Sequence, residues 1–265
     1  MDNERTLDLL NQMNDRMNNK FETSIQINMT TSQIRVPLPE PIKLNPKLSY
    51  KVGVRLFSVF NMPRIVNSTN NKFRYSKDSG ATWKTVTLNP GAYEYTDLNN
   101  EIKRQLELNS DWVDKAIEIG TDIPAGRFTL TLKAGYQVDF TISNSIRLIL
   151  GFFSRIITFT GTTTADDIGN IEGGINTINI KTDITSGGYI TNERGDLVRK
   201  GIVYSIPFLS VGIGQKIIDK QQTPVFYDIN QNNISAIYVS IIDEKDRLID
   251  FGGQNITVVL HIKQV

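Results

Sequence analysis

Apolar and polar residues alternate in short segments along most of this chain. Clear examples lie at residues 25–29, 50–56 and 256–262. Because successive side chains of a strand point to opposite faces of a sheet, this alternation predicts strands with one buried face. The segments follow one another through turns, without the helices that would separate the strands of a parallel sheet. The pattern therefore predicts an all-β sandwich or barrel.

Turn residues suggest which strands form hairpins. The Asp78-Ser79-Gly80 turn predicts one hairpin, and Lys133-Ala134-Gly135 is expected to join 128–132 to 136–142 in another. The last two strands are expected to turn at Asp243–Asp246. Single strands are expected at 175–184, 201–209, 233–242 and 256–262. Long loops are expected between strands, at about 110–125, 156–173 and 211–230.

The stretch TVTLNPGAYEYTDLNNEIKRQLELN predicts a strand, a Pro-Gly turn and a helix over about 96–108. Thr96 or Asp97 is expected to cap this helix. Its apolar residues recur at helical spacing, at Leu98, Ile102 and Leu106. The same order of elements forms phosphate-binding loops, but this turn has one glycine and no lysine, and Glu94 and Asp97 would repel a phosphate. A structural corner at one end of the sandwich is therefore expected, with a second, short helix at 144–152.

The first 22 residues differ from the rest of the chain. Their apolar residues have helical spacing on a polar background and form the candidate contacts of an arm: Leu7, Leu10, Met13 and Met17. An amphipathic arm of this kind is expected to dock on a partner or on its own domain. Residues 23–265 are expected to form one domain, and the hairpin and helix within 62–125 are a candidate insertion.

Composition excludes several classes of function. Lys plus Arg is 29 and Asp plus Glu is 28, which argues against a protein whose main task is to coat nucleic acid. A local basic patch stays open, because a balanced total can hide asymmetry. The chain has no cysteine, which excludes disulfides, thiolate nucleophiles and cysteine-bound metals. No apolar run of about 18 residues occurs, so no transmembrane segment is expected.

Candidate catalytic residues are few. The one histidine, His261, alternates with the apolar residues of the last strand. It therefore belongs to the polar face of that strand and is expected at the surface, not in a catalytic role. Two groups of carboxylates, Asp166-Asp167 and Asp243, Asp246 and Asp250, lack the spacing of a calcium loop. Neither a metal nor a cofactor is expected, and the sequence does not suggest an enzyme.

Three segments carry a family resemblance: Pro90-Gly91-x-Tyr93 before the helix, Leu150-Gly151-Phe152, and Asp250-Phe251 before the closing strand. In their order and spacing, over roughly residues 24–265, they resemble the minor capsid (penton) proteins of Polinton/Maverick elements, adintoviruses and virophages. None of the three is a catalytic signature.

The resemblance implies a single jelly-roll β-sandwich with one short helix and an N-terminal arm. It also implies a homopentamer at the vertices of an icosahedral shell, with a double jelly-roll major capsid protein as partner and no specific nucleic acid. The protein would then be part of the virion, assembled inside the host cell. Virophage pentons can carry an inserted domain at their outer surface, for which 62–125 is the candidate.

Two other functions remain open on the sequence. A sandwich can serve as a viral attachment or glycan-binding module, in which Trp83 or Trp112 would stack on sugars. These tryptophans are expected instead in the core or at an interface. A sandwich-fold glycan hydrolase is the third reading, in which Asp243, Asp246 and His261 are the residues to mutate.

Overall fold

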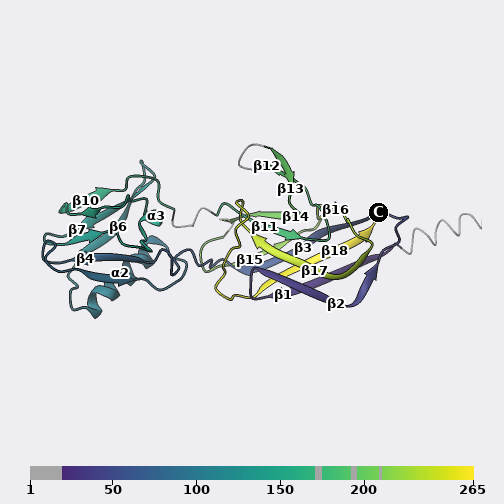
Figure 1. Ribbon diagram of the computed structural model, residues 1–265, viewed down its shortest axis with the longest axis horizontal. Coiled ribbons are helices and arrows are strands. Elements are labelled where there is room, and N and C mark those ends of the chain that lie inside the picture. The colour runs from purple at the N-terminus through teal and green to yellow at the C-terminus, as the bar shows by residue number, and fades with distance from the viewer. Residues whose placement is uncertain (1–19, 171–174, 192–195, 209–210) are drawn as a thin grey trace, which may run out of the picture. The chain divides into compact units, whose positions relative to one another are not determined.

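The computed structural model describes residues 20–170, 175–191, 196–208 and 211–265 of the chain. The chain divides into two compact units (Figure 1). Unit 1 comprises Met1–Asn61 and Asn176–Val265, and unit 2 comprises Met62–Ile175. The predicted arm contacts, Leu7, Leu10, Met13 and Met17, lie outside the described residues. No helix in the described ranges has the length and apolarity needed to cross a bilayer.

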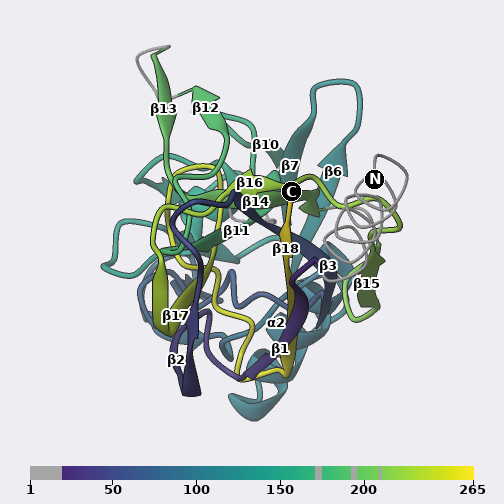
Figure 2. The same cartoon turned by 90° about the vertical axis from the view of Figure 1, so that its right-hand side faces the viewer.

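Unit 1 is a sandwich of two antiparallel sheets. One has the strand order β1-β18-β3-β15, and β16 also pairs with β3; the other has the order β14-β11-β17-β2 (Figure 2). A two-stranded ribbon joins β12 to β13. The strands are β1 (Glu22–Met29), β2 (Gln33–Lys43), β3 (Tyr50–Phe60), β11 (Thr177–Thr182), β12 (Tyr189–Thr191), β13 (Leu197–Arg199), β14 (Ile202–Pro207), β15 (Lys216–Lys220), β16 (Tyr227–Asp228), β17 (Asn233–Ile242) and β18 (Ile256–Gln264).

The strand order of unit 1 is that of a jelly roll. Numbered along the chain without the short β12, β13 and β16, its strands form one sheet in the order 1-8-3-6 and the other in the order 5-4-7-2. Two Greek keys folded over one another give this arrangement. The expected jelly-roll fold is confirmed for this unit.

The expected hairpin between the last two strands is wrong. β17 pairs with β2 and β11, whereas β18 pairs with β1 and β3 in the other sheet. The turn at Asp243–Asp246 is real, because the Arg247 carbonyl accepts from the Asp243 N–H at 2.9 Å. The chain then crosses to the opposite sheet, because in a jelly roll consecutive strands often belong to different sheets.

Strand β2 illustrates how the sequence protects a sheet edge. It pairs with β17 on one side only, and three of its exposed positions are Pro37, Pro39 and Pro41. Proline cannot donate a ladder hydrogen bond and is therefore tolerated at an edge strand, where it also discourages pairing with another chain.

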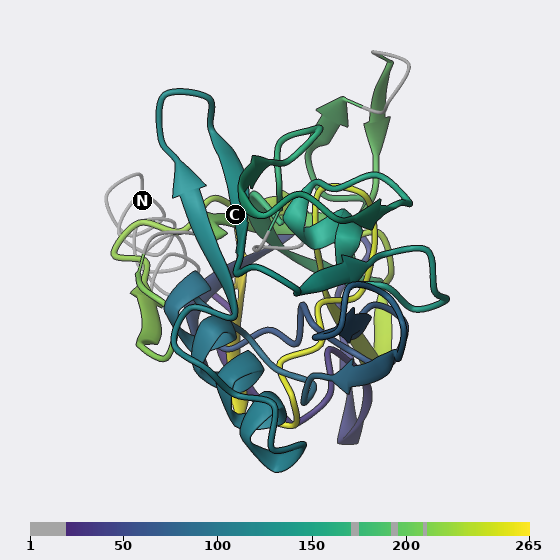
Figure 3. The same cartoon turned by 90° about the vertical axis from the view of Figure 1, so that its left-hand side faces the viewer.

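Unit 2 is inserted between β3 and β11 and contains two smaller antiparallel sheets with a helix, α2 (Figure 3). The sheets have the strand orders β5-β4-β8-β9 and β10-β7-β6. The elements are β4 (Lys72–Ser76), β5 (Lys84–Thr87), α2 (Tyr95–Leu108), β6 (Ile117–Asp122), β7 (Arg127–Leu132), β8 (Gln137–Asp139), α3 (Arg147–Leu150), β9 (Ile156–Ile157) and β10 (Gly161–Thr164).

The structure changes the expected boundaries and pairings of this region. The proposed insertion at 62–125 begins at the same residue as unit 2, but the unit continues to Ile175, so residues 23–265 do not form one compact unit. The β4–β5 hairpin and both helices are confirmed. The hairpin through Lys133-Ala134-Gly135 is wrong, because β7 and β8 belong to different sheets.

The three expected long loops contain strands that the apolar pattern does not reveal. β6 lies within 110–125, β9 and β10 within 156–173, and β15 and β16 within 211–230. β10 has the sequence Gly-Thr-Thr-Thr and β9 has two residues. Segments this short or polar become strands only because a neighbouring strand offers them backbone hydrogen bonds.

Helix α2 covers the core of unit 2 with the predicted stripe. Leu98, Ile102 and Leu106 are buried in one apolar cluster with strand residues such as Phe73 and Leu130. The helix begins one residue earlier than expected, and its N-cap is Glu94 rather than Thr96 or Asp97. Asp97 is the third helical residue, and its carboxylate accepts a hydrogen bond from the Glu94 N–H at 3.3 Å, as in a capping box.

Candidate functional site

The Pro90-Gly91-x-Tyr93 segment is a structural corner of unit 2. Gly91 exchanges two backbone hydrogen bonds with Val66, of 2.9 and 3.0 Å, and the Tyr93 hydroxyl donates to the Asn89 carbonyl at 2.7 Å. Tyr93 also packs against the core of the unit, while Pro90 is exposed. These contacts hold the turn and leave the helix N-terminus next to Glu94 and Asp97, which disfavour a bound phosphate.

The Leu150-Gly151-Phe152 segment ends helix α3 inside unit 2. Gly151 has φ 76°, and a Cβ there would lie 2.3 Å from the Asp167 carbonyl oxygen and 2.9 Å from the Gly169 nitrogen. Only glycine meets both conditions without strain. The following Phe152 is buried and stacks on Phe140, with ring centroids 5.2 Å apart.

The third motif belongs to the other unit. Phe251 is buried in unit 1, and the exposed Asp250 accepts a hydrogen bond from the Gly252 N–H at 2.8 Å. The motif residues therefore do not form one site: Pro90, Gly91, Tyr93, Leu150, Gly151 and Phe152 lie in unit 2, and Asp250 and Phe251 lie in unit 1. Each of the three segments shapes the backbone locally.

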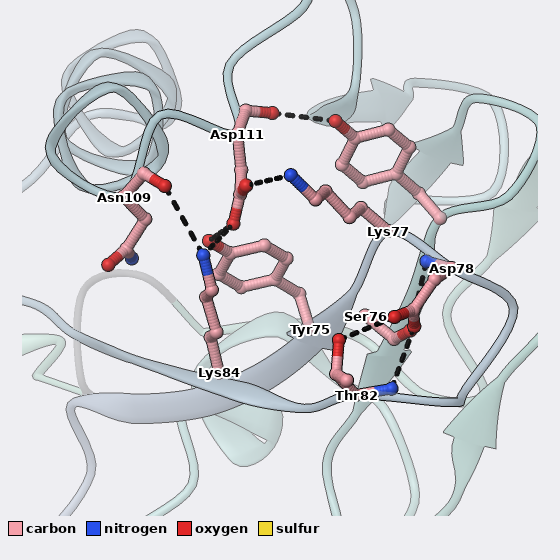
Figure 4. A network of polar contacts seen from close by, with 9 residues as sticks. Tyr75, Ser76, Lys77, Asp78, Thr82, Lys84, Asn109 and Asp111 are labelled. Carbon is pink, nitrogen blue, oxygen red and sulfur yellow. Dashed lines mark hydrogen bonds and ion pairs between the residues drawn. The ribbon is translucent and has the colours of Figure 1, made fainter.

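A network of polar contacts around Asp111 brings several ionisable side chains of unit 2 together (Figure 4). Asp111 follows α2 and its side chain is almost completely buried. Lys77 and Lys84 place their ammonium groups 2.5 and 2.6 Å from its carboxylate oxygens, and the Tyr75 hydroxyl donates to it at 2.8 Å. The Tyr136 hydroxyl donates to the Asp111 carbonyl at 2.6 Å.

The electrostatics of this network favour a permanently charged carboxylate. Burial alone would raise the pKa of Asp111, but hydrogen bonds from Lys77, Lys84 and Tyr75 outweigh it and lower the pKa to about 2. Burial, followed by the bond to Asp111, raises the pKa of Tyr75 well above its usual range. A carboxylate that stays ionised at neutral pH and a phenol that stays protonated are suited to holding a hairpin against the end of a helix, rather than to proton transfer.

The sequence did not single out Asp111. It lies in a segment expected to be a loop, and its partners come from a hairpin more than 25 residues away along the chain, as the Lys84 contact shows. An acidic residue soon after a predicted helix was the one available signal, and that signal is common to many surface residues.

His261 is buried, contrary to expectation. Its side chain is on the predicted polar face of β18, but only 6% of the residue is exposed. The segment before β16 lies over that face, and Phe226 packs edge-on against the imidazole with ring centroids 5.8 Å apart. Ser24 and Glu22 on the neighbouring strand lie 2.9 and 2.7 Å from its two ring nitrogens. The face of β18 on which His261 lies was predicted correctly, but the segment that covers this face was not predicted.

The other candidate carboxylates are held in separate local contacts. Asp243 is buried and pairs with Arg247, and Asp246 contacts Lys200 at 2.5 Å. Asp166 pairs with Arg155 at 2.8 Å in unit 2. Within the described ranges, no group of three or more histidine, cysteine, aspartate or glutamate residues has the arrangement of a metal site.

The two tryptophans are half-buried in unit 2, and each has a cation over its ring. The Arg74 guanidinium lies 5.7 Å from the Trp83 ring centroid, and the Lys103 ammonium lies 5.4 Å from that of Trp112. Trp112 also packs against the apolar core of the unit. A cation in this position occupies one face of the ring, so a sugar could not stack on that face.

Comparisons with known proteins find matches among solved structures. No protein-family model matches the sequence, and no curated protein matches it. Among solved structures, the chain is similar to the crystal structure of the mavirus penton protein, with 13% sequence identity and a TM-score of 0.47, over 93% of this chain and 100% of that one. At this distance, the strand order of unit 1 is the firmer evidence for the fold.

Proposed function

We propose that this protein is a structural capsid protein of the penton type. In this proposal, unit 1 is the assembly domain and forms a symmetric homopentamer at the vertices of an icosahedral shell. A double jelly-roll major capsid protein would form the faces of that shell, and the protein would be located in the virion, assembled inside the host cell.

The observation that supports the proposal most strongly is the pair of four-stranded sheets with jelly-roll order in unit 1. The order agrees with what the motif resemblance implied independently. The same fold also occurs in lectins and enzymes. It therefore supports a structural role only together with the arrangement of the ionisable side chains and with the inserted unit.

The ion pairs and the inserted unit favour a role in assembly over catalysis. At Asp111 and Asp243, ionisable groups are held in compact ion pairs of the kind that stabilises a fold. A unit of more than a hundred residues is inserted between β3 and β11. Such an insertion fits the resemblance, because virophage pentons can carry an added domain at their outer surface.

Strand β15 offers a candidate subunit contact. It is an edge strand that pairs with β3, and its Ile218 is 64% exposed on the same face as Phe60, which is 40% exposed. Exposed apolar side chains at a sheet edge favour association with another chain. We therefore include Ile218 and Phe60 in the proposed interface between subunits.

Replacing Ile218 by aspartate is expected to weaken subunit association by about tenfold or more, because a charge would be buried at the contact. Mass photometry of the purified protein at several concentrations measures this change. The matched control is Leu48→Asp, which adds the same charge at another exposed apolar residue of unit 1. If Ile218→Asp and wild type assemble alike, β15 is not at the interface. The proposed function is wrong if the wild-type protein remains monomeric alone and also does not enter particles when it is co-expressed with the major capsid protein.

A further inference from the structure

A groove lies on the outer face of the sheet that contains β1, β18, β3 and β15, the strands labelled in Figure 2. The segment 220–226, which follows β15, forms one wall. The residues that line the groove are Glu22, Arg55, Lys220, Gln221, Gln222, Thr223, Pro224, Phe226, His261 and Lys263. Apart from His261, a candidate catalytic residue, none of them was singled out by the sequence, since they come from four separate strands and one loop.

The wall of the groove is held closely against the sheet. A Cβ on Gly53 would lie 2.5 Å from the Val225 carbonyl oxygen and 3.3 Å from the Phe226 ring, so only glycine allows this approach. The Gln221 N–H also donates to the Arg55 carbonyl at 2.9 Å. These contacts show that the 221–226 segment has a defined position in unit 1.

A β-bulge directs Arg55 outward. Val259 of β18 lies opposite Leu56, whereas the next residue, Leu260, lies opposite Val54, so Arg55 is the extra residue on β3. A bulge commonly re-aims one side chain of a strand. Arg55 is exposed and lines the groove together with Lys220.

The other end of the groove is ordered by aromatic contacts. The Lys263 ammonium lies 3.9 Å from the Phe226 ring centroid, and Phe226 in turn packs on His261. Glu22 is the one carboxylate of the lining, and it contacts the His261 imidazole at 2.7 Å. The side chains at this end are therefore positioned by the protein itself.

The charge of the lining is unbalanced. It contains three cationic side chains and one carboxylate, although the whole chain has a net charge of only +1. Within the part of the chain that the structure describes, Arg55, Lys220 and Lys263 form no ion pair, in contrast to Lys77 and Lys84 of unit 2. An excess of two positive charges in a groove matches a doubly charged oxyanion.

We propose that this groove binds an oxyanion group, sulfate or phosphate, either free or carried on a saccharide. Arg55 supplies planar donors for two oxygens, and Lys220 supplies an ammonium group. Lys263, held on the Phe226 ring at the other end, adds to the positive charge of the groove. Gln222 and Thr223 line the same groove and offer polar contacts for neighbouring hydroxyl groups. The proposal does not depend on the capsid function.

The test uses the full chain and isothermal titration calorimetry with three probes: inorganic sulfate, a sulfated oligosaccharide and its desulfated counterpart. The sulfated probe is expected to bind, and the desulfated probe is expected not to bind. Arg55→Gln and Lys220→Gln are each expected to weaken binding by about tenfold, because each removes a charged hydrogen-bond donor. Binding of inorganic sulfate at the same site would identify the free ion as sufficient, and binding of the oligosaccharide alone would show that the saccharide contributes.

The matched control is Lys245→Gln, which removes a positive charge from an exposed turn outside the groove and is expected to leave the affinity unchanged. Thermal unfolding of each variant verifies that the fold is intact. Equal binding of the sulfated and desulfated probes, an absence of binding to any probe, or equal loss of affinity in Lys245→Gln and Arg55→Gln would overturn the proposal.

Discussion

Replacing Gly151 by alanine is expected to destabilise unit 2 by about 3 kcal/mol, because two costs add at this position. Gly151 has φ 76°, a conformation that alanine adopts only at a cost. The new Cβ would also lie 2.3 Å from the Asp167 carbonyl oxygen, a backbone atom that can move only if the chain around it moves.

Urea unfolding followed by tryptophan fluorescence measures this effect. Both tryptophans of the chain, Trp83 and Trp112, lie in unit 2, so their emission reports on that unit. Gly126→Ala is the matched control, because Gly126 has φ 64° but a Cβ added there would meet no heavy atom within 4 Å. The control is expected to lose about 1 kcal/mol, the conformational cost alone. Equal losses in the two variants would show that the Asp167 backbone does not approach Gly151 closely.

Replacing Asp111 by asparagine is expected to cost about 2–3 kcal/mol at neutral pH, because it leaves two lysines without their shared carboxylate. This loss of stability is smaller than that expected on breaking a fully buried ion pair. Lys77 and Lys84 are both roughly half exposed, so water replaces part of their interaction with the carboxylate. Asp114→Asn, at an exposed position in the same loop, is the control and is expected to change the free energy of unfolding by less than about 0.5 kcal/mol.

The contribution of Asp111 is also expected to depend on pH in a defined direction. Its pKa is about 2 in the folded protein, below the value of about 3.9 for an unfolded chain. A lowered pKa stabilises the folded state above the unfolded pKa, and the stabilisation disappears as the pH falls from about 4 towards 2. The difference between wild type and Asp111→Asn should therefore shrink over this range. A difference that stays constant from pH 7 to pH 2 would contradict the assigned ion pairs.

The strands and helices of this protein were predictable where a regular apolar pattern marks a buried face. Strand β18 and helix α2 are examples, since each has its buried apolar residues at the spacing of its own secondary structure. In β3 the predicted alternation holds only up to Val54, because the bulge at Arg55 moves Leu56 to the other face. The partners of the strands were not predictable in the same way. β17 and β18 are consecutive long strands, but their pairing depends on the crossing between sheets, which turn residues do not encode.

The candidate sites were less predictable than the fold. Asp111 and Arg55 acquire their surroundings from residues that are distant in sequence, such as Tyr75 and Lys220. The buried position of His261 results from a covering segment whose close approach depends on a single glycine, Gly53. The spacing of apolar residues along a strand indicates which face a side chain occupies, but it does not indicate which segment covers that face.

Co-expression with the cognate double jelly-roll major capsid protein, followed by electron cryo-microscopy of the particles, tests the capsid proposal most directly. The proposal predicts icosahedral particles whose vertices each contain five copies of this 29.9 kDa chain, with unit 1 at the contacts between copies. Vertices filled by another protein, in particles that form equally well without this chain, would contradict it.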